Sequence, residues 1–242
     1  MESLEKFYNW QTTSVILVLS YFVLVGSTYL VVYKFGKTKF KNYKIQRPTI
    51  PAFTIRMEVF YSVLTLGIYT LSSWLVYDLY QMGATKIYFD FQEYSIFYFL
   101  SSIVFMIVLH DTYFYWTHRL IHHPRIFKIV HRVHHLSQNP SPWASYSFHP
   151  FEAMISVGYI FIIILLFPAH PLALLSALGA MFIFNLLGHL GYEFFPNWFV
   201  TSKVGQWINC STFHNLHHKN SRHNYGLYFT FWDRLMGTFK PD

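Results

Sequence analysis

Histidines occur in this chain in three short clusters whose spacing suits metal binding. The chain has 14 histidines among its 242 residues. Residues three or four apart lie on one face of a helix, so each cluster can direct its imidazoles to a common point. Imidazole is a good ligand for iron, zinc, copper and nickel. The clusters contain His118, His122 and His123; His131, His134 and His135; and His214, His217 and His218.

A fourth pair with helical spacing, Asn185 and His189, ends an apolar stretch of the sequence. His189 is a further candidate ligand, whereas the role of Asn185 stays open. Nine histidines can then point to one region, which is more than a single four-coordinate zinc ion can use. Two ions with four or five nitrogen ligands each would use them all. The sequence therefore predicts a two-metal centre held by His118, His122, His131, His134, His135, His189, His214, His217 and His218.

The first cluster leaves two choices of ligand. His118 is followed by one histidine four positions later and by another five positions later. The four-residue spacing matches the helical repeat better, so His122 is the expected ligand and His123 is the alternative.

Carboxylates are scarce around the clusters. The Glu-x-x-His motif of soluble di-iron bundles is absent from the sequence. We therefore expect the nearby acids to orient imidazoles from behind rather than to bind metal. His149 and His223 also adjoin the clusters, and both a supporting role and a purely structural role stay open for them. The acids in question are Asp111, Glu152 and Glu193.

The rest of the chain is unusually apolar. Hydrophobic residues make up 53% of the sequence and charged residues 12%, against about 25% charge in a typical soluble domain. Long apolar stretches can cross the ~30 Å hydrocarbon layer as helices. The segment Pro168-Ala169-His170-Pro171 separates the last two stretches, because two prolines end one helix and start another, and His170 is expected to be a loop residue. The apolar stretches cover residues 14–33, 59–79, 94–109 with a helical continuation to 118, 151–167 and 172–187.

These stretches predict an all-α fold. We expect a polytopic membrane helical bundle with about four transmembrane helices, two of them a hairpin, and a cytosolic histidine-rich helical cap. Residues 1–93 are expected to form the N-terminal transmembrane helices and a basic cytoplasmic loop. Residues 94–242 are expected to form the catalytic domain.

Positive charge is distributed unevenly among the segments that connect the predicted membrane helices. If the helices alternate in direction, 16 of the 18 lysines and arginines lie on the same side as the histidines. Only Lys6 and Lys86 lie on the other side. Because positive charge concentrates on the cytoplasmic side, we expect the N-terminus outside and the histidine clusters inside. Basic segments facing anionic lipid headgroups also account for the net charge of +7, so no nucleic acid is expected as a partner.

The histidine clusters and several motifs between them resemble the fatty acid hydroxylase and sterol desaturase superfamily. The resemblance covers about residues 109–239 and rests on the combination H-x3-H, H-x2-H-H and H-x2-H-H. The x3 form of the first motif resembles the sterol-modifying branch, although some members have histidine at the position matched to Asn185. The accompanying motifs are Asn139-Pro140-Ser141-Pro142, Phe148-His149-Pro150, Gly188-His189-Leu190-Gly191-Tyr192-Glu193 and Asn224-Tyr225-Gly226.

This resemblance implies an integral membrane enzyme with two iron ions and a cytosolic active site. Such an enzyme uses O₂ as co-substrate to hydroxylate or desaturate a lipid, which here could be a sterol or a fatty acyl chain. Its electrons are expected from a separate protein of the cytochrome b5, ferredoxin or reductase type. A histidine-rich metal transporter or metal-binding protein is the alternative. A transporter, however, usually places its ligands within the membrane spans rather than at their ends.

The charge distribution generates a prediction about topology. A reporter domain fused after Asp242 should lie in the cytoplasm, because the basic segments are expected there. Protease protection or a compartment-specific reporter measures this directly. Activity of the reporter outside the cell would contradict the predicted orientation.

Overall fold

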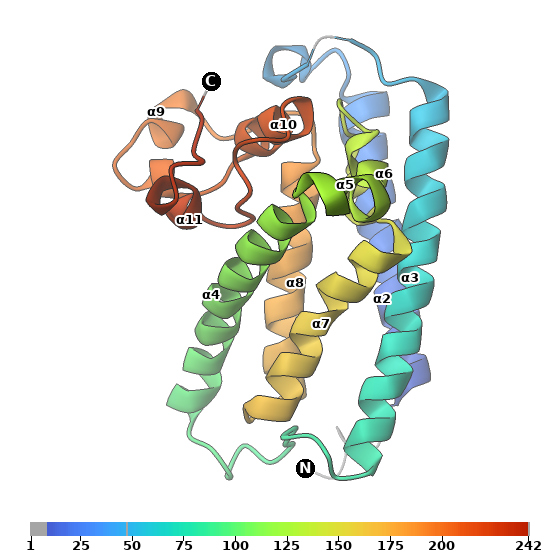
Figure 1. The fold of residues 1–242 in the computed structure, drawn as a ribbon, viewed down its shortest axis with the longest axis vertical. Coiled ribbons are helices and arrows are strands. Elements are labelled where there is room, and N and C mark those ends of the chain that lie inside the picture. The colour runs from blue at the N-terminus through green and yellow to red at the C-terminus, as the bar shows by residue number, and fades with distance from the viewer. Residues whose placement is uncertain (1–8, 47, 242) are drawn as a thin grey trace.

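The computed structural model describes residues 9–46 and 48–241, and this part of the chain is helical with no strands. Lys6, Arg47 and Asp242, which entered the topology argument, lie outside the described residues. The long helices run roughly along one direction (Figure 1). They are α2 (Trp10–Thr28), continued by the π-helical η1 (Tyr29–Phe35), α3 (Ala52–Gln81), α4 (Ile96–Ile121), α7 (Pro150–Leu166) and α8 (Pro171–Gly188).

Short elements gather at one end of these helices (Figure 1). They carry two of the three histidine clusters and form the cap that the sequence predicts. They include α5 (Pro124–Val130), α6 (Arg132–His135), α9 (Asn197–Val200), α10 (Ser211–Lys219) and α11 (Phe231–Leu235), with the 3-10 turns η2 (Lys41–Tyr43), η3 (Pro142–Tyr146) and η4 (Gly205–Trp207).

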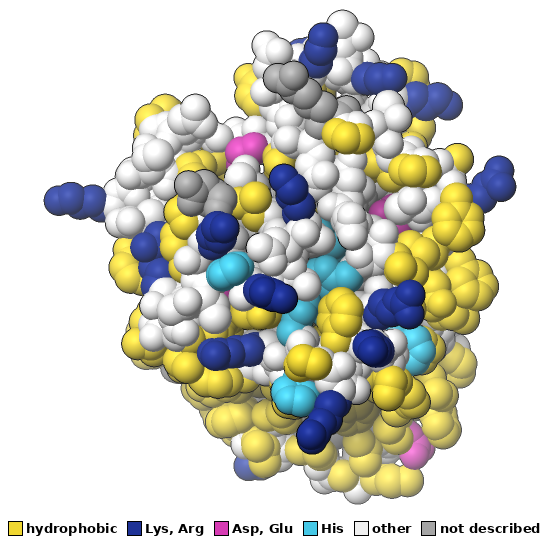
Figure 2. Space-filling view, turned by 45° about the horizontal axis from the view of Figure 1, so that its top comes forward, with side chains coloured by type: hydrophobic (Ala, Val, Ile, Leu, Met, Phe, Trp, Pro, Cys, Tyr) yellow, Lys and Arg dark blue, Asp and Glu magenta, His cyan; other side chains and the backbone are white. Residues whose placement is uncertain are grey.

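Four of the described helices are long and apolar enough to cross a membrane: Trp10–Phe35, Ala52–Gln81, Ile96–Ile121 and Pro171–Gly188. A span of ~30 Å needs about 20 helical residues, and α7 is shorter, with 17. Lysines and arginines gather on the face where histidines are visible, and hydrophobic side chains cover the part below it (Figure 2). The prediction of an all-α, multi-pass membrane bundle is confirmed.

The two helices of the predicted hairpin begin with the same His-Pro sequence. In α7 and α8 a proline occupies the first turn, where a missing N–H costs nothing. The preceding histidine caps each helix: His149 accepts from the backbone N–H of Phe151, and His170 from that of Leu172. The sequence His-Pro therefore sets where each arm starts.

His170 is more than the loop residue that the sequence suggested. Its side chain is fully buried. The ring stacks on Phe91, with centroids 4.2 Å apart, and contacts Tyr88 and Phe99 edge-on. The segment between α3 and α4 thus folds back over the turn between α7 and α8, where residues 86–88 also exchange backbone hydrogen bonds with that turn.

The first two helices hold the segment that follows the second histidine cluster. Both α2 and α3 contact η3: the hydroxyls of Tyr21 and Ser62 donate to the carbonyl of Trp143. Glu58, fully buried on α3, accepts hydrogen bonds from the backbone N–H and the hydroxyl of Ser141. The N-terminal helices therefore contact the half of the chain that carries the histidine clusters.

His170 generates a stability prediction. His170→Ala should lower the free energy of unfolding by about 3 kcal/mol, because it removes an aromatic ring from a filled cage as well as a cap. His149→Ala is the matched control, since it loses the same kind of cap from a less buried position, at a cost of about 1 kcal/mol. Thermal unfolding of the purified variants measures both. Metal content should stay unchanged in His170→Ala, and equal losses of stability in the two variants would contradict this account.

Candidate metal centre

The nine histidines singled out in the sequence lie in two buried groups. One contains His118, His122, His131, His135 and His217, and the other contains His134, His189, His214 and His218. Within each group every residue can offer one nitrogen, and these atoms lie within 4.8 Å of one another. Each group therefore has the ligand type, number and spacing to hold one metal ion.

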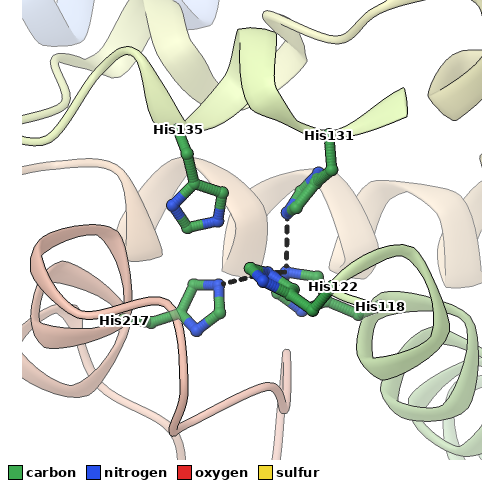
Figure 3. A group of neighbouring side chains, drawn as sticks. All are labelled: His118, His122, His131, His135 and His217. Atoms are coloured by element: carbon green, nitrogen blue, oxygen red, sulfur yellow. Dashed lines mark hydrogen bonds between the residues drawn. The ribbon is translucent and has the colours of Figure 1, made fainter. Parts of the chain in front are cut away.

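The five-histidine group is assembled from α4, the segment around α6 and α10 (Figure 3). The Nε2 atoms of His118 and His131 are 3.1 Å apart, and that of His122 lies 3.3 Å from His118 and 3.1 Å from His217. Ligands about 2.1 Å from one metal ion lie about 3.0 to 3.4 Å from their neighbours in octahedral or tetrahedral geometry. The observed spacing fits that range.

The four-histidine group has the same spacing. The Nε2 atom of His189 lies 3.1 Å from those of His134 and His214 and 3.2 Å from that of His218. His214 and His218 come from one face of α10, with their Nε2 atoms 3.2 Å apart. His189 caps the end of α8, so a membrane helix and the cap meet at this group.

Backbone carbonyls fix the orientation of four of these rings. The Nδ1–H groups of His118 and His217 donate to the carbonyls of Tyr225 and His223, at 2.8 and 2.6 Å. Those of His134 and His189 donate to the carbonyls of Ser147 and Asn185. A carbonyl oxygen only accepts, so in each of these rings Nδ1 carries the proton and Nε2 presents a lone pair.

A fifth ring, that of His131, lies against an acid. Its Nδ1 is 2.8 Å from a carboxyl oxygen of Glu152, without the alignment of a hydrogen bond.

Lone pairs of the oriented rings face other nitrogens in both groups. In the four-histidine group, those of His134 and His189 face each other at 3.1 Å. In the five-histidine group, Nε2 of His122 lies 3.3 Å from that of His118 and 3.1 Å from that of His217, and one proton on His122 can satisfy only one of them. Acceptors at these distances repel each other unless a cation lies between them, so the residues fit two metal ions.

Burial keeps these imidazoles in the neutral form that binds metal. Desolvation lowers the pKa of His189 to about 4 from its usual value of 6.5. Burial, with neighbouring histidines as a smaller cause, also holds the pKa values of His131, His134, His214 and His218 well below 6.5. At neutral pH no proton competes with a metal ion for their nitrogens.

The two groups adjoin each other through α6. His131 and His135 belong to the first group, whereas His134 between them belongs to the second. The ring of His135 stacks on that of His218 with centroids 4.9 Å apart, so it links the two groups. One helical turn therefore serves both candidate metal ions.

Several other candidates from the sequence lie outside both groups. His123 is exposed and accepts from the backbone N–H of Arg125, so the structure brings His122 to the centre and not His123. His149 caps α7, and the carbonyl of His223 orients His217. The side chain of His223 is not a member of either group.

Of the three acids expected to orient imidazoles, Glu152 alone lies against one of the nine, His131, whereas Asp111 and Glu193 accept from backbone N–H groups. Asp111 accepts from the backbone N–H groups of Tyr228 and Phe229. Glu193 accepts from the backbone N–H and hydroxyl of Thr212 at the start of α10. Both carboxylates hold backbone segments of the cap, because those segments have N–H groups that need acceptors.

A cavity lies beside the two groups, between α4 and α7. It is mostly apolar, and its lining includes His118, His131, His134 and Glu152. Asn185 also lines it, with its amide N–H donating to the carbonyl of Ser145. Both histidine groups therefore border one cavity that a small part of an organic substrate can enter.

Two features that contact the candidate ligands could not be assigned a role from the sequence. One is the set of backbone carbonyls that orient four rings. The other is Tyr225, whose ring lies 5.1 to 5.7 Å from the rings of His122, His217 and His118. Only the motif Asn224-Tyr225-Gly226 marked this region in the sequence.

Residues 103–238, which contain all nine histidines, match the family model described as fatty acid hydroxylase. This chain belongs to the fatty acid hydroxylase family. The matched region runs from α4 to the end of the cap and so covers the whole site. No solved structure matches the chain.

Curated relatives of this family member include sterol enzymes. The chain is 32% identical to human lathosterol oxidase over 190 residues, which is 78% of this chain and 59% of the relative. It is 28% identical to the mouse lathosterol oxidase over 241 residues, covering 95% and 76% of the two chains. It is 31% identical to a Delta(7)-sterol 5(6)-desaturase of Aspergillus fumigatus over 231 residues, covering 92% and 59%. The chain thus spans about three fifths of the length of the human and fungal relatives.

The geometry of the first cluster generates a comparison of two variants. His122→Ala should lose metal, because it removes a nitrogen that lies 3.1 Å from that of His217. His123→Ala is the matched control: it changes a neighbouring histidine that only caps a short helix. Elemental analysis of protein purified with iron should give about two ions per chain for the wild type and His123→Ala, and fewer for His122→Ala. The reverse ranking would place the ligand at His123.

Proposed function

We propose that this chain is a membrane oxidoreductase of sterol biosynthesis that holds two iron ions and uses O₂ to desaturate or hydroxylate a sterol-like lipid. The observation that carries this proposal is the pair of buried histidine groups whose Nε2 atoms converge at 3.1 to 3.3 Å. The family and the names of its sterol-modifying relatives support the substrate class. A fatty acyl chain is the second candidate substrate.

The nine histidines are proposed as the ligands, five for one ion and four for the other. Bound iron supplies redox chemistry with O₂ that zinc, with its filled d shell, does not. The protein's part is to hold the ligands rigidly, and most of the nine side chains are at least 97% buried. The surrounding apolar helices exclude water from the reacting carbon, which protects reactive species from side reactions.

A sterol is proposed to enter from the bilayer along the contact between α4 and α7. Besides the cavity beside the histidines, a second cavity of about 320 Å³ lies further along the same two helices and is lined by Tyr98, Met106, Ile163 and Phe167. Its part on α4 belongs to a helix that is long and apolar enough to cross a membrane. The second cavity is proposed as the place where an apolar substrate first leaves the lipid.

Electrons are proposed to come from a separate carrier protein on the cytoplasmic side. Forming one double bond removes two electrons and two protons from the lipid. Reducing O₂ to two water molecules takes four of each, so a donor must provide the other two electrons. The face over the histidines is rich in lysine and arginine (Figure 2). Exposed cations in the segments that carry the second and third histidine clusters include Arg125, Lys128, Arg132, Lys219 and Arg222.

Turnover of a named sterol tests the proposal. Membranes containing the chain and an electron donor should consume O₂ and convert lathosterol to a product lighter by two hydrogens or heavier by one oxygen. Mass spectrometry measures the product, and His122→Ala membranes are the control. Binding of metal without O₂ consumption or any change in membrane lipids would favour a metal-binding or transport protein instead.

A further inference from the structure

Glu152 has one carboxylate oxygen that the protein leaves without a partner. Its Oε1 lies 2.8 Å from Nδ1 of His131, as described above. Its Oε2 is buried and makes no hydrogen bond. The whole residue is only 7% exposed. A buried carboxylate oxygen without a donor is costly, commonly by 1–3 kcal/mol or more, so a donor is needed at this position.

A donor for Oε2 can come from the cavity, because Glu152 lines it. The three hydroxyl groups in the lining are already engaged: that of Thr117 donates to the carbonyl of Tyr113, that of Tyr113 donates to the carbonyl of Ile155, and that of Ser156 pairs with Tyr69. The amide of Asn185 is committed to Ser145. The lining hydroxyls and this amide are thus turned away, and an incoming molecule can meet Oε2 directly.

We propose that Oε2 of Glu152 accepts a hydrogen bond from the hydroxyl group of the substrate, and so selects a sterol alcohol over a lipid without a hydroxyl near the reacting carbons. This inference rests on the proposed function. Glu152 acts as a specificity-determining residue at the end of the cavity nearest the candidate metal ions.

The position of Glu152 matches the chemistry of a sterol. A sterol carries its hydroxyl on carbon 3, two bonds from carbon 5, and the fungal relative is named for desaturation at the 5(6) position. The carboxylate contacts one edge of the His131 ring, and the opposite edge of that ring presents Nε2 to the metal site. A hydroxyl bound at Oε2 therefore keeps carbon 5, two bonds from carbon 3, on the side of the cavity that His131 lines. The apolar remainder of the sterol then lies along α4 and α7.

The test compares lathosterol with its 3-deoxy analogue, which differs only in lacking the hydroxyl. In the wild type, kcat/KM for lathosterol should exceed that for the analogue by about tenfold to a hundredfold, the usual cost of leaving a buried polar group without its hydrogen-bond partner. Glu152→Gln keeps the side-chain shape and an oxygen for His131 but replaces the acceptor. Its preference for the alcohol should fall at least tenfold, and because the preference is a ratio of two kcat/KM values for the same sample, a change in metal content does not alter it.

Thr117→Val is the matched control, because it changes a hydroxyl in the same cavity that is already bonded within its own helix. It should keep the wild-type ratio of the two kcat/KM values. An unchanged ratio in Glu152→Gln, or equal use of the two sterols by the wild type, would overturn the inference and indicate that only water meets Oε2.

A binding measurement separates this inference from the proposed function. The zinc-loaded wild type, which needs no turnover, should bind lathosterol at least tenfold more tightly than the deoxy analogue. That result would support the inference even if the iron-loaded protein leaves lathosterol unchanged, in which case the proposed reaction fails alone. Equal affinities would overturn the inference, and the measurement also stands if Glu152→Gln loses metal.

Discussion

The arrangement of the site depends on a fixed proton position on each imidazole. Where Nδ1 donates to an oxygen, Nε2 is left as a lone pair, and the ring cannot turn without breaking that hydrogen bond. Four backbone carbonyls impose this on four rings. The result is two groups of histidines in which neighbouring Nε2 lone pairs repel each other unless a cation lies between them. The rest of the fold serves to keep those oxygens in place.

The oxygens are held by segments that come from distant parts of the chain. The carbonyl of Ser147 follows η3, which α2 and α3 fix through Tyr21, Ser62 and Glu58. The carbonyls of His223 and Tyr225 belong to the loop after α10, where Asp233 accepts from the backbone N–H of Tyr225. Each of these rings is thus oriented by a backbone carbonyl, and the segment that carries the carbonyl is held in place by hydrogen bonds of its own. Such layered support keeps ligand positions precise without disulfides in a chain whose one cysteine is free.

Much of the fold could be read from the sequence because helices in a membrane have a strong local signal. The apolar stretches, the histidine spacing and the His-Pro starts of α7 and α8 are properties of neighbouring residues. The sequence could not predict which histidines belong to which group. His134 falls in a different group from His131 and His135 because of the direction in which one short helical turn presents its side chains. The roles of Asp111 and Glu193 were wrongly predicted for a related reason. Proximity in sequence to a cluster says nothing about which backbone N–H groups lie nearby in space.

The turn formed by α6 has a consequence for how the protein loads its metal. His131 and His135 serve one group and His134 the other, so a rotation of this turn moves ligands of both groups together. If each group holds one metal ion, an ion in one group would constrain this turn and with it a ligand of the other group. The coupling between the two sites would then be reciprocal, because thermodynamic linkage makes each ion change the affinity for the other by the same factor.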